Sequence, residues 1–238
     1  MSVSWNPWHG CHRVSEGCRN CYVYRIDGKH GRESGTVTLN AEFLLPLRES
    51  KGVFKMESGE TVYTCFSSDF LIAEADEWRS DAWRMMKLRP DLHFVFFTKR
   101  IERLQDVLPP DWGDGYENVT VGCTCENQDR ADARLPIFLS LPLRHRVIVC
   151  EPLLGPIDLR PYLDRTKIES VSAGGESGDG ARICDYDWIL GIRSACAEVG
   201  IRFSYHQTGA LLRRDGTLYR IPRRHQHEQA ARAGIDLH

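Results

Sequence analysis

The chain has 238 residues, of which 42% are hydrophobic and 27% are charged, and its formal net charge is −2 at pH 7. This composition is typical of a globular protein that is large enough to bury one substantial core. The near-neutral charge excludes a protein whose whole surface attracts nucleic acid. No apolar run is long enough for a membrane span and the N-terminus has no signal-peptide pattern, so we expect a cytoplasmic protein without membrane partners.

Short β-branched or aromatic runs alternate with amphipathic segments along most of the chain. The runs lack polar–apolar alternation at their centres, which is typical of parallel strands that are buried on both faces. We predict strands at 3–5, 61–66, 92–97, 118–123, 146–150, 168–173 and 201–206. We predict helices at 74–88, with Trp78, Ala82, Met85 and Met86 on its apolar face, at 128–141, and at 187–200, ending at Gly200.

The alternation of strands and helices predicts an α/β fold with a parallel sheet and right-handed crossovers. Six or seven such units fit a partial (β/α) barrel, and a doubly wound sheet remains the alternative. We assign residues 1–212 to a single barrel-like domain with an N-terminal cysteine loop. Residues 27–60 are expected to be a loop and a short helix over one barrel end, and residues 213–238 a basic, peripheral C-terminal tail.

Polar side chains follow six of the predicted strands, at the point where each strand ends. In parallel α/β proteins ligands bind at the carboxyl ends of the strands. Loops are polar in any protein, so one such strand end would carry little weight, but the recurrence at six ends predicts a binding site. The residues at these strand ends are Ser67, Ser68, Asp69, Thr98, Lys99, Arg100, Thr124, Glu126, Asn127, Glu151, Pro152, Gly174, Gly175, Glu176, Ser177, His206 and Gln207.

Nine cysteines are present, and three of them form the spacing C-x6-C-x2-C at Cys11, Cys18 and Cys21. Three thiolates this close in sequence can converge on one soft metal centre. On a [4Fe–4S] cluster they would leave one iron open, whereas zinc would need a fourth ligand such as His9 or His12. Spacing alone leaves both centres open. We expect the other six cysteines to be core residues: Cys65, Cys123, Cys125, Cys150, Cys184 and Cys196.

Five segments together resemble one known family. They are WNPWHGCHRVSEGCRNCY, FFTKR, CENQDRADARLP, CEPLLGPIDL and AGGESGDGAR, and the matches run over nearly the whole chain. They resemble the phage and bacterial three-Cys-motif proteins of unknown function, a family that is similar to radical S-adenosylmethionine enzymes. The resemblance implies a partial (β/α) barrel with a [4Fe–4S] cluster on Cys11, Cys18 and Cys21, and S-adenosyl-L-methionine bound at the open iron.

The chain departs from the usual radical-enzyme pattern, which has three residues between the first two cysteines and Gly-Gly-Glu after the second strand. The resemblance therefore carries over only the three cysteine ligands. Asp69 and Glu176 are candidates for the cofactor's ammonium group or ribose, and Lys99 and Arg100 for a carboxylate or phosphate. Further candidates near cofactor or substrate are Ser67, Glu126, Asn127, Glu151, Gly174, Gly175, His206 and Gln207.

These observations predict an enzyme of the radical S-adenosylmethionine type with an external one-electron donor and an unknown small-molecule, nucleotide or nucleic-acid substrate. A need for a partner protein stays open. The nucleic-acid prediction rests on the phage resemblance and on the basic tail, which could also be a solvated surface. The alternatives are a zinc-stabilised nucleic-acid-binding module, with Trp5, Trp8 and Tyr22 as stacking surfaces, and a non-catalytic iron–sulfur redox or sensor protein.

Overall fold

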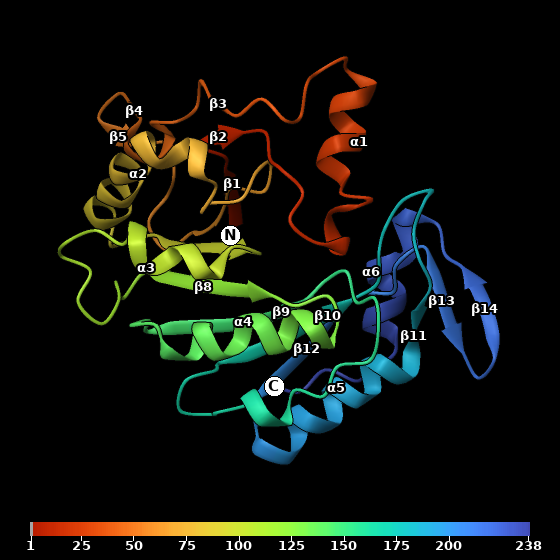
Figure 1. Cartoon of the computed structure of the whole chain (residues 1–238). Helices are drawn as coiled ribbons and strands as arrows, with labels where there is room; N and C mark the ends of the chain where they lie inside the picture. The colour runs from red at the N-terminus through yellow and green to blue at the C-terminus, as the bar shows by residue number, and fades with distance from the viewer. Residues whose placement is uncertain (1) are drawn as a thin grey trace. The chain divides into compact units, whose positions relative to one another are not determined.

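A seven-stranded parallel sheet organises the chain in the computed structural model, which describes residues 2–238 (Figure 1). All seven predicted strands are confirmed to within two residues at each end. Neighbours in the sheet follow the order β1 (Ser2–Trp5), β6 (Thr61–Thr64), β7 (His93–Thr98), β8 (Val119–Thr124), β9 (His145–Cys150), β10 (Ser170–Gly174) and β12 (Arg202–Gln207).

The strand order decides between the two predicted architectures. Each strand lies beside the next long strand of the chain, so the order never reverses. A doubly wound sheet has a reversal, at which its ligand site forms. The sequential order is that of a (β/α) barrel, and the prediction of a mixed α/β fold of the partial-barrel type is confirmed.

Three longer helices match the predicted ones: α2 (Asp76–Leu88), α4 (Gln128–Ser140) and α5 (Tyr186–Val199). Gly200 ends α5 with φ of 70°, a left-handed conformation that favours glycine. The predicted apolar face of α2 was partly wrong, because Trp83 and Arg79 are buried while Trp78 is only half-buried. The guanidinium of Arg79 is accommodated there by Asp76 and by the carbonyl oxygens of Phe70 and Ile72.

The remaining elements are short. The helices are α1 (Tyr22–Lys29), α3 (Leu104–Val107) and α6 (Arg223–Arg232), with single 3₁₀ turns at Glu16–Cys18, Leu45–Leu47, Ala73–Ala75, Ile101–Arg103 and Arg160–Tyr162. The strands are β2 (Trp8–His9), β3 (Thr38–Leu39), β4 (Glu49–Ser50), β5 (Val53–Phe54), β11 (Cys184–Asp185), β13 (Leu211–Arg214) and β14 (Thr217–Arg220).

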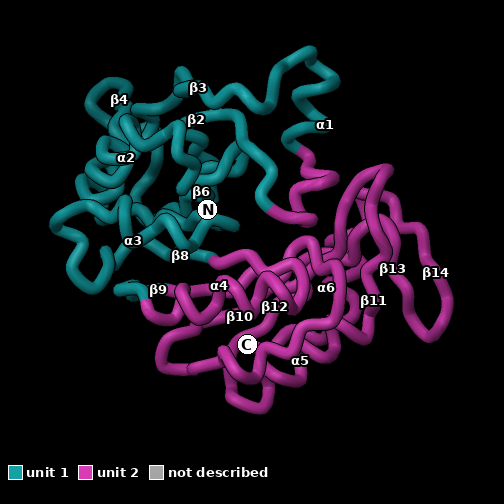
Figure 2. The backbone as a smooth tube through the Cα atoms, viewed as in Figure 1, with its two compact units in different colours: residues 1–14, 23–122, 141–145 teal, residues 15–22, 123–140, 146–238 magenta. Residues whose placement is uncertain are grey.

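The chain divides into two compact units (Figure 2). Unit 1 comprises Met1–Val14, Val23–Gly122 and Leu141–His145, and unit 2 comprises Ser15–Tyr22, Cys123–Ser140 and Arg146–His238. An aromatic cluster forms the core of unit 1, where the ring of Phe70 lies 4.6 Å from Phe96 and 4.8 Å from Trp83. In unit 2, α5 packs on β10 and β12 through buried residues such as Ile189 and Ile192.

Strands such as β7 and β10 are buried on one face and partly exposed on the other, whereas β8 is buried on both faces. In β7 the side chains of Phe94 and Phe96 are buried, whereas those of Val95 and Phe97 are half-buried. In β10 Val171 is buried and Ser172 half-buried. Because side chains alternate across a strand, the half-buried residues of each of these strands lie on one face.

The C-terminal residues 213–238, predicted as a peripheral tail, contribute ordered structure to unit 2. They contain part of β13, all of β14 and α6. Helix α6 packs on β12 with Gln226 and Ala230 buried, and the carbonyl of Gln226 accepts from the N–H of Thr208 at 3.2 Å. Within residues 2–238, no helix has both the length and the apolar character that crossing a bilayer requires.

Gly175 offers a test of the packing of unit 2. A Cβ on this residue would lie 3.0 Å from Cys184 Cβ and from Gly209 Cα, and closer still to the carbonyl oxygen of Thr208. We expect Gly175→Ala to lower the free energy of unfolding by about 1–3 kcal/mol, measured by urea denaturation. Gly191→Ala is the matched control, since its Cβ would meet nothing within 4 Å in α5. An equal effect of both substitutions would contradict this packing.

Candidate functional site

The nine cysteines separate into two groups, as predicted. Cys11, Cys18 and Cys21 are partly exposed. Burial raises the pKa of the thiols of Cys184 and Cys196 to about 12, so these remain protonated at neutral pH. The six residues predicted to be core are all buried: Cys65, Cys123, Cys125, Cys150, Cys184 and Cys196. The cysteines accessible to a metal are therefore the three that the sequence selects.

Cys11 belongs to unit 1, where it lies beside a buried ion pair. Its sulfur accepts from the guanidinium of Arg100 at 3.6 Å, and Arg100 also donates to the carbonyl of His12 at 2.7 Å. The guanidinium lies 3.1 Å from the carboxylate of Asp69, and both side chains are 8% exposed. Burial alone would lower the pKa of Arg100, but Asp69 and Cys11 outweigh it and raise the pKa. A permanent positive charge is thus placed beside the first cysteine.

Asp69 is saturated by protein donors. Its Oδ1 accepts from the N–H of Leu71 at 2.9 Å and from Thr98 Oγ1 at 2.8 Å. Its Oδ2 accepts from the N–H of Lys99 at 3.0 Å, in addition to Arg100. All of these groups follow β6 or lie at or just after the end of β7, so the carboxyl ends of two neighbouring strands meet at this carboxylate. Asp69 is placed to orient Arg100.

The two serines before Asp69 bind the backbone that leads to Cys11. Ser67 Oγ donates to the carbonyl of Trp8 at 3.0 Å, and Ser68 Oγ donates to the carbonyl of Gly10. Gly10 has φ of 97°, a conformation that favours glycine. Lys99 is half-buried, and within residues 2–238 its ammonium group forms no ion pair. Of the predicted residues in unit 1, Lys99 is thus the cation available to an anionic ligand.

Cys18 and Cys21 belong to unit 2, in a turn that starts at Ser15. The N–H of Cys18 bonds the carbonyl of Ser15 at 3.0 Å, and the N–H of Cys21 bonds the carbonyl of Cys18 at 3.3 Å. The two thiols are therefore carried by consecutive tight turns. The C-x2-C spacing therefore places both thiols on one short, hydrogen-bonded segment.

Two carboxylates at strand ends bind this cysteine turn. Glu126, after β8, is fully buried and accepts from Arg134 at 2.5 Å and from Ser15 Oγ. A Cβ on Gly17 would clash with the carboxylate of Glu126, so only glycine fits beneath the turn. Arg134 also donates to the carbonyl of Thr124 at 2.7 Å, which connects the turn to the end of β8.

Glu176, after β10, is the second of these carboxylates. Its Oε2 accepts from Asn20 Nδ2 at 3.0 Å, and its Oε1 from Arg182 at 2.5 Å. Burial raises the pKa of Glu176, but the hydrogen bonds from Arg182 and Asn20 outweigh it and lower the pKa below its usual range. Arg182 in turn donates to the carbonyl of Glu16 at 2.9 Å. The carboxylate is thus ionised and fully bonded to the residues around the cysteine turn.

Glu16 is bonded to α4 from within the turn itself. Asn127 donates to its Oε1 at 2.5 Å and Arg130 to its Oε2 at 2.9 Å. A backbone hydrogen bond within Glu16 and the Arg130 guanidinium lower the pKa of this carboxyl to about 2. Ser15, Glu16 and Asn20 thus each bond the turn to other segments of unit 2.

A third group of predicted residues forms a separate cluster at the ends of β9, β10 and β12. Glu151 accepts from Ser172 Oγ at 3.0 Å and pairs with His206 Nδ1 at 2.7 Å. The hydrogen bond to Glu151 raises the pKa of His206, whose ring is half-exposed. The Nε2 of His206 is therefore available for proton transfer. Gly174 packs beside Glu151 and Gln207, so its lack of a side chain serves packing.

Six residues in the networks around the cysteine turn were not predicted. They are Ser15, Glu16, Asn20, Arg130, Arg134 and Arg182. Arg182 lies six residues after Glu176 in the segment AGGESGDGAR, and Arg134 lies eight residues after Glu126 in the segment CENQDRADARLP, so both pairings are local in sequence. By contrast, Ser15, Asn20 and Arg130 are 111, 156 and 114 residues away from the carboxylates that they bind.

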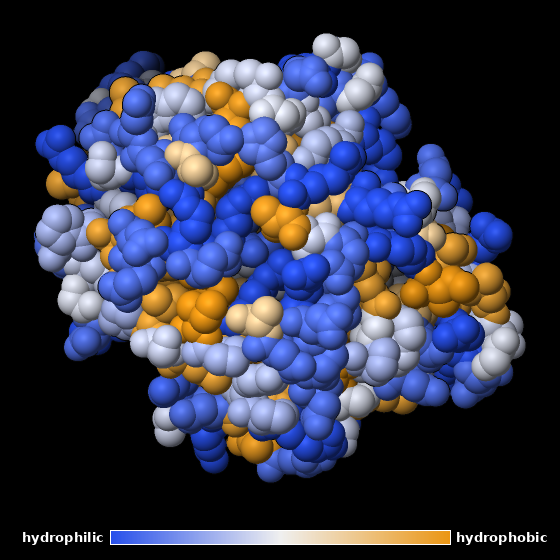
Figure 3. Space-filling view, in the orientation of Figure 1, coloured by the Kyte–Doolittle hydropathy of each residue, from blue (hydrophilic) through white to orange (hydrophobic). Residues whose placement is uncertain are grey.

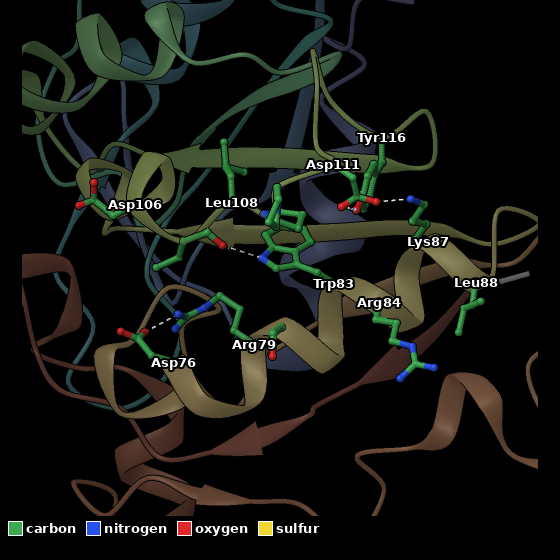
Figure 4. A pocket seen from close by; sticks show the side chains of 14 residues that line it. Asp76, Arg79, Trp83, Arg84, Lys87, Leu88, Asp106, Leu108, Asp111 and Tyr116 are labelled. Carbon is green, nitrogen blue, oxygen red and sulfur yellow. Dashed lines mark hydrogen bonds and ion pairs between the residues drawn. The ribbon is translucent and has the colours of Figure 1, made fainter.

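A surface pocket of about 790 Å³ lies elsewhere in unit 1, between α2 and residues 106–116 (Figure 4). Its walls include Trp83 and the ion pair of Lys87 with Asp111. None of the predicted site residues lines it. The pocket is thus distinct from the strand ends that carry the candidate site.

The described residues contain no ready-made metal site. Across residues 2–238, no three His, Cys, Asp or Glu side chains are gathered as metal ligands. Nε2 of His9 bonds Asp27 at 2.9 Å and Nε2 of His12 bonds Glu74 at 2.7 Å, so only Nδ1 of either ring would be open to zinc. The fit to a metal centre rests on the donor set of three accessible thiols.

The buried pair of Asp69 and Arg100 can be tested by stability. We expect Asp69→Asn to cost roughly 3–5 kcal/mol of unfolding free energy, because it leaves a buried guanidinium without its counter-charge. The measurement is the urea denaturation curve. Glu198→Gln, which breaks an exposed ion pair with Arg160, should leave the curve nearly unchanged. A small effect of Asp69→Asn would contradict the charged, buried pair.

The lowered pKa of Glu16 predicts that the stability of the fold depends on pH. Because its folded pKa of about 2 lies below its ordinary value of 4.5, its contribution to stability is present above pH 4.5 and is lost as the pH falls towards 2. Glu16→Gln should flatten the fall in urea midpoint over this range, whereas Glu117→Gln, in unit 1, should leave it in place. If the urea midpoint of Glu16→Gln fell with pH as steeply as that of the parent protein, this contribution of Glu16 would be contradicted.

Comparison with known proteins adds a family but no activity. No curated protein and no solved structure matches the chain. A family model described as a protein of unknown function, DUF5131, matches residues 1–236, nearly the whole length. The chain therefore belongs to the DUF5131 family.

Proposed function

We propose that this protein is an enzyme of the radical S-adenosylmethionine type, with Cys11, Cys18 and Cys21 as the ligands of a [4Fe–4S] cluster. The observation that carries the proposal is the accessibility of these three thiols in a chain whose other six cysteines are buried. The sequential parallel sheet supports it, because that architecture leaves the strand ends open for a large cofactor and a substrate.

The donor set fits a cubane cluster better than it fits zinc. Three thiolates leave one coordination position for a small molecule, whereas structural zinc requires a fourth protein ligand. The imidazoles of His9 and His12 already bond carboxylates through Nε2. A Cys3His zinc site, and with it a nucleic-acid-binding module without catalysis, is the second candidate. A cluster protein that only senses or transfers electrons is the third.

When bound, the cluster and S-adenosylmethionine would supply a carbon radical after reduction by an external electron donor. The chain's own residues position the cysteine ligands. Arg100, oriented by Asp69, places positive charge beside Cys11. Glu126 and Glu176 fix the turn that carries Cys18 and Cys21. These carboxylates are saturated by the chain, so we assign them positioning rather than cofactor contact.

Two groups remain free to meet cofactor or substrate. Lys99 has no ion-pair partner within residues 2–238 and can bind a carboxylate or phosphate. His206, oriented by Glu151, can hold or release a proton at Nε2. We propose these as the substrate- and cofactor-facing groups, with a small molecule, a nucleotide or nucleic acid as substrate.

Cluster loading is the test of this proposal. Anaerobic reconstitution with iron and sulfide should give about four irons and four sulfides per chain and broad absorbance near roughly 400 nm. Cys18→Ala should lose the cluster, because a ligand is removed, whereas Cys196→Ala, at a buried thiol, should retain it. With dithionite and S-adenosylmethionine, the loaded protein should release 5′-deoxyadenosine.

Other outcomes identify the competing functions. One zinc per chain and no iron would overturn the proposal in favour of the zinc-stabilised module. A cluster that never cleaves S-adenosylmethionine would overturn the enzymatic part and favour the sensor.

A further inference from the structure

The β13–β14 hairpin extends from the body of unit 2 (Figures 1 and 2). Its turn consists of Asp215 and Gly216, which have φ of 50° and 74°. Two successive left-handed residues are the geometry of a tight two-residue hairpin turn. Every residue of β14 is exposed, and β14 is the edge strand of the small sheet β11–β13–β14. Strand β14 therefore presents its side chains to solvent, whereas Leu212 of β13 is buried.

The hairpin and α6 carry a concentrated positive charge. Residues 211–232 contain six arginines and two acidic residues, a net charge of +4, whereas the whole chain carries −2. Arg213 pairs with Asp185 at 2.6 Å, and Arg232 pairs with Glu228 at 2.6 Å. Residues 211–232 therefore form a locally positive region on a chain whose other residues carry a net negative charge.

Three arginines of this region are without an acidic partner in the part of the chain that the structure describes. Within residues 2–238, Arg220, Arg223 and Arg224 form no ion pair. Arg223 donates to Ser177 Oγ at 2.7 Å, and Arg224 donates to the ring of the adjacent His225. These guanidinium groups remain free to bind phosphates, which they match in a planar, bidentate geometry.

Exposed apolar side chains lie on the same hairpin. Tyr219 is 48% exposed and Leu218 is 44% exposed, next to Arg220. Figure 3 shows apolar side chains among hydrophilic ones over the hairpin. An exposed aromatic ring on a hairpin that carries arginines offers a face on which a nucleobase can stack, and the arginines without ion-pair partners offer contacts to phosphates.

We propose that the β13–β14 hairpin and the first turn of α6 bind single-stranded nucleic acid. Arg220, Arg223 and Arg224 contact its phosphates, and Tyr219 stacks on a base. The inference rests on the proposed function only in naming the substrate class of that enzyme. The binding itself depends on unit 2 and needs no cluster, so the two can fail separately.

The test is fluorescence anisotropy of the full chain with labelled 20-nucleotide single-stranded DNA, RNA of the same sequence and the DNA duplex. Titrations are run between 50 and 200 mM salt, because phosphate contacts release counterions. Arg223→Ala/Arg224→Ala should weaken binding and reduce the slope of log affinity against log salt by about 1.4 for single strands. Arg165→Ala/Lys167→Ala, an exposed basic pair elsewhere in unit 2, is the matched control and should change neither.

Tyr219→Ala separates stacking from charge. It should weaken single-strand binding about 5-fold or more while leaving the salt slope unchanged. Equal affinity for the duplex with no effect of Tyr219→Ala would overturn the single-strand assignment. Absence of binding by any oligonucleotide, an equal loss in the control pair, or binding only to vesicles that contain phosphatidylserine would overturn the proposal altogether.

The same titration on Cys18→Ala distinguishes this proposal from the proposed function. Retained binding in the absence of a cluster supports the hairpin surface on its own. Cluster loading and cofactor cleavage without oligonucleotide binding would contradict the hairpin surface and leave the enzymatic proposal standing.

Discussion

Buried carboxylates at the ends of parallel strands must find donors within the chain, and this requirement shapes the candidate site. Glu126 and Glu176 lie in the interior of unit 2, where an unpaired charge would cost several kcal/mol. Their donors come from Arg134 and Arg182 and from Ser15 and Asn20, residues of the cysteine turn. The hydrogen bonds that these two carboxylates accept thereby fix the segment that carries Cys18 and Cys21. In unit 1, the carboxylate of Asp69 holds the guanidinium of Arg100 beside Cys11.

The fold was largely predictable because each long strand reads as an apolar run with polar residues at its end. The strand order was not, since the alternation of elements contains no information on which strands are neighbours. The two-residue strands β2, β3, β4, β5 and β11 are too short to leave a pattern. On α2, burial of Arg79 in place of Trp78 depends on carbonyl oxygens and an aspartate that only the folded chain brings together.

The sequence predicted which residues lie in the site better than it predicted the role of each residue. The split between accessible and buried cysteines followed from the apolar surroundings of the buried six, and is confirmed. The strand ends predicted Asp69, Glu126 and Glu176, but not that each would be saturated by the protein. Their partners are far away in sequence, since Asn20 and Glu176 are 156 residues apart and Ser15 and Glu126 are 111 apart. Pairings at such separations leave no local signal.

The central claim is that the strand-end carboxylates order the cysteine turn before any metal binds. Amide hydrogen exchange of the metal-free protein measures this directly, because the N–H groups of Cys18, Arg19 and Cys21 bond carbonyls within the turn. The account predicts that these amides are protected in the parent protein and exchange much faster in Glu176→Gln, while α5 is unaffected. Exchange in the parent at the rate of an unstructured peptide, or an unchanged rate in the variant, would contradict it.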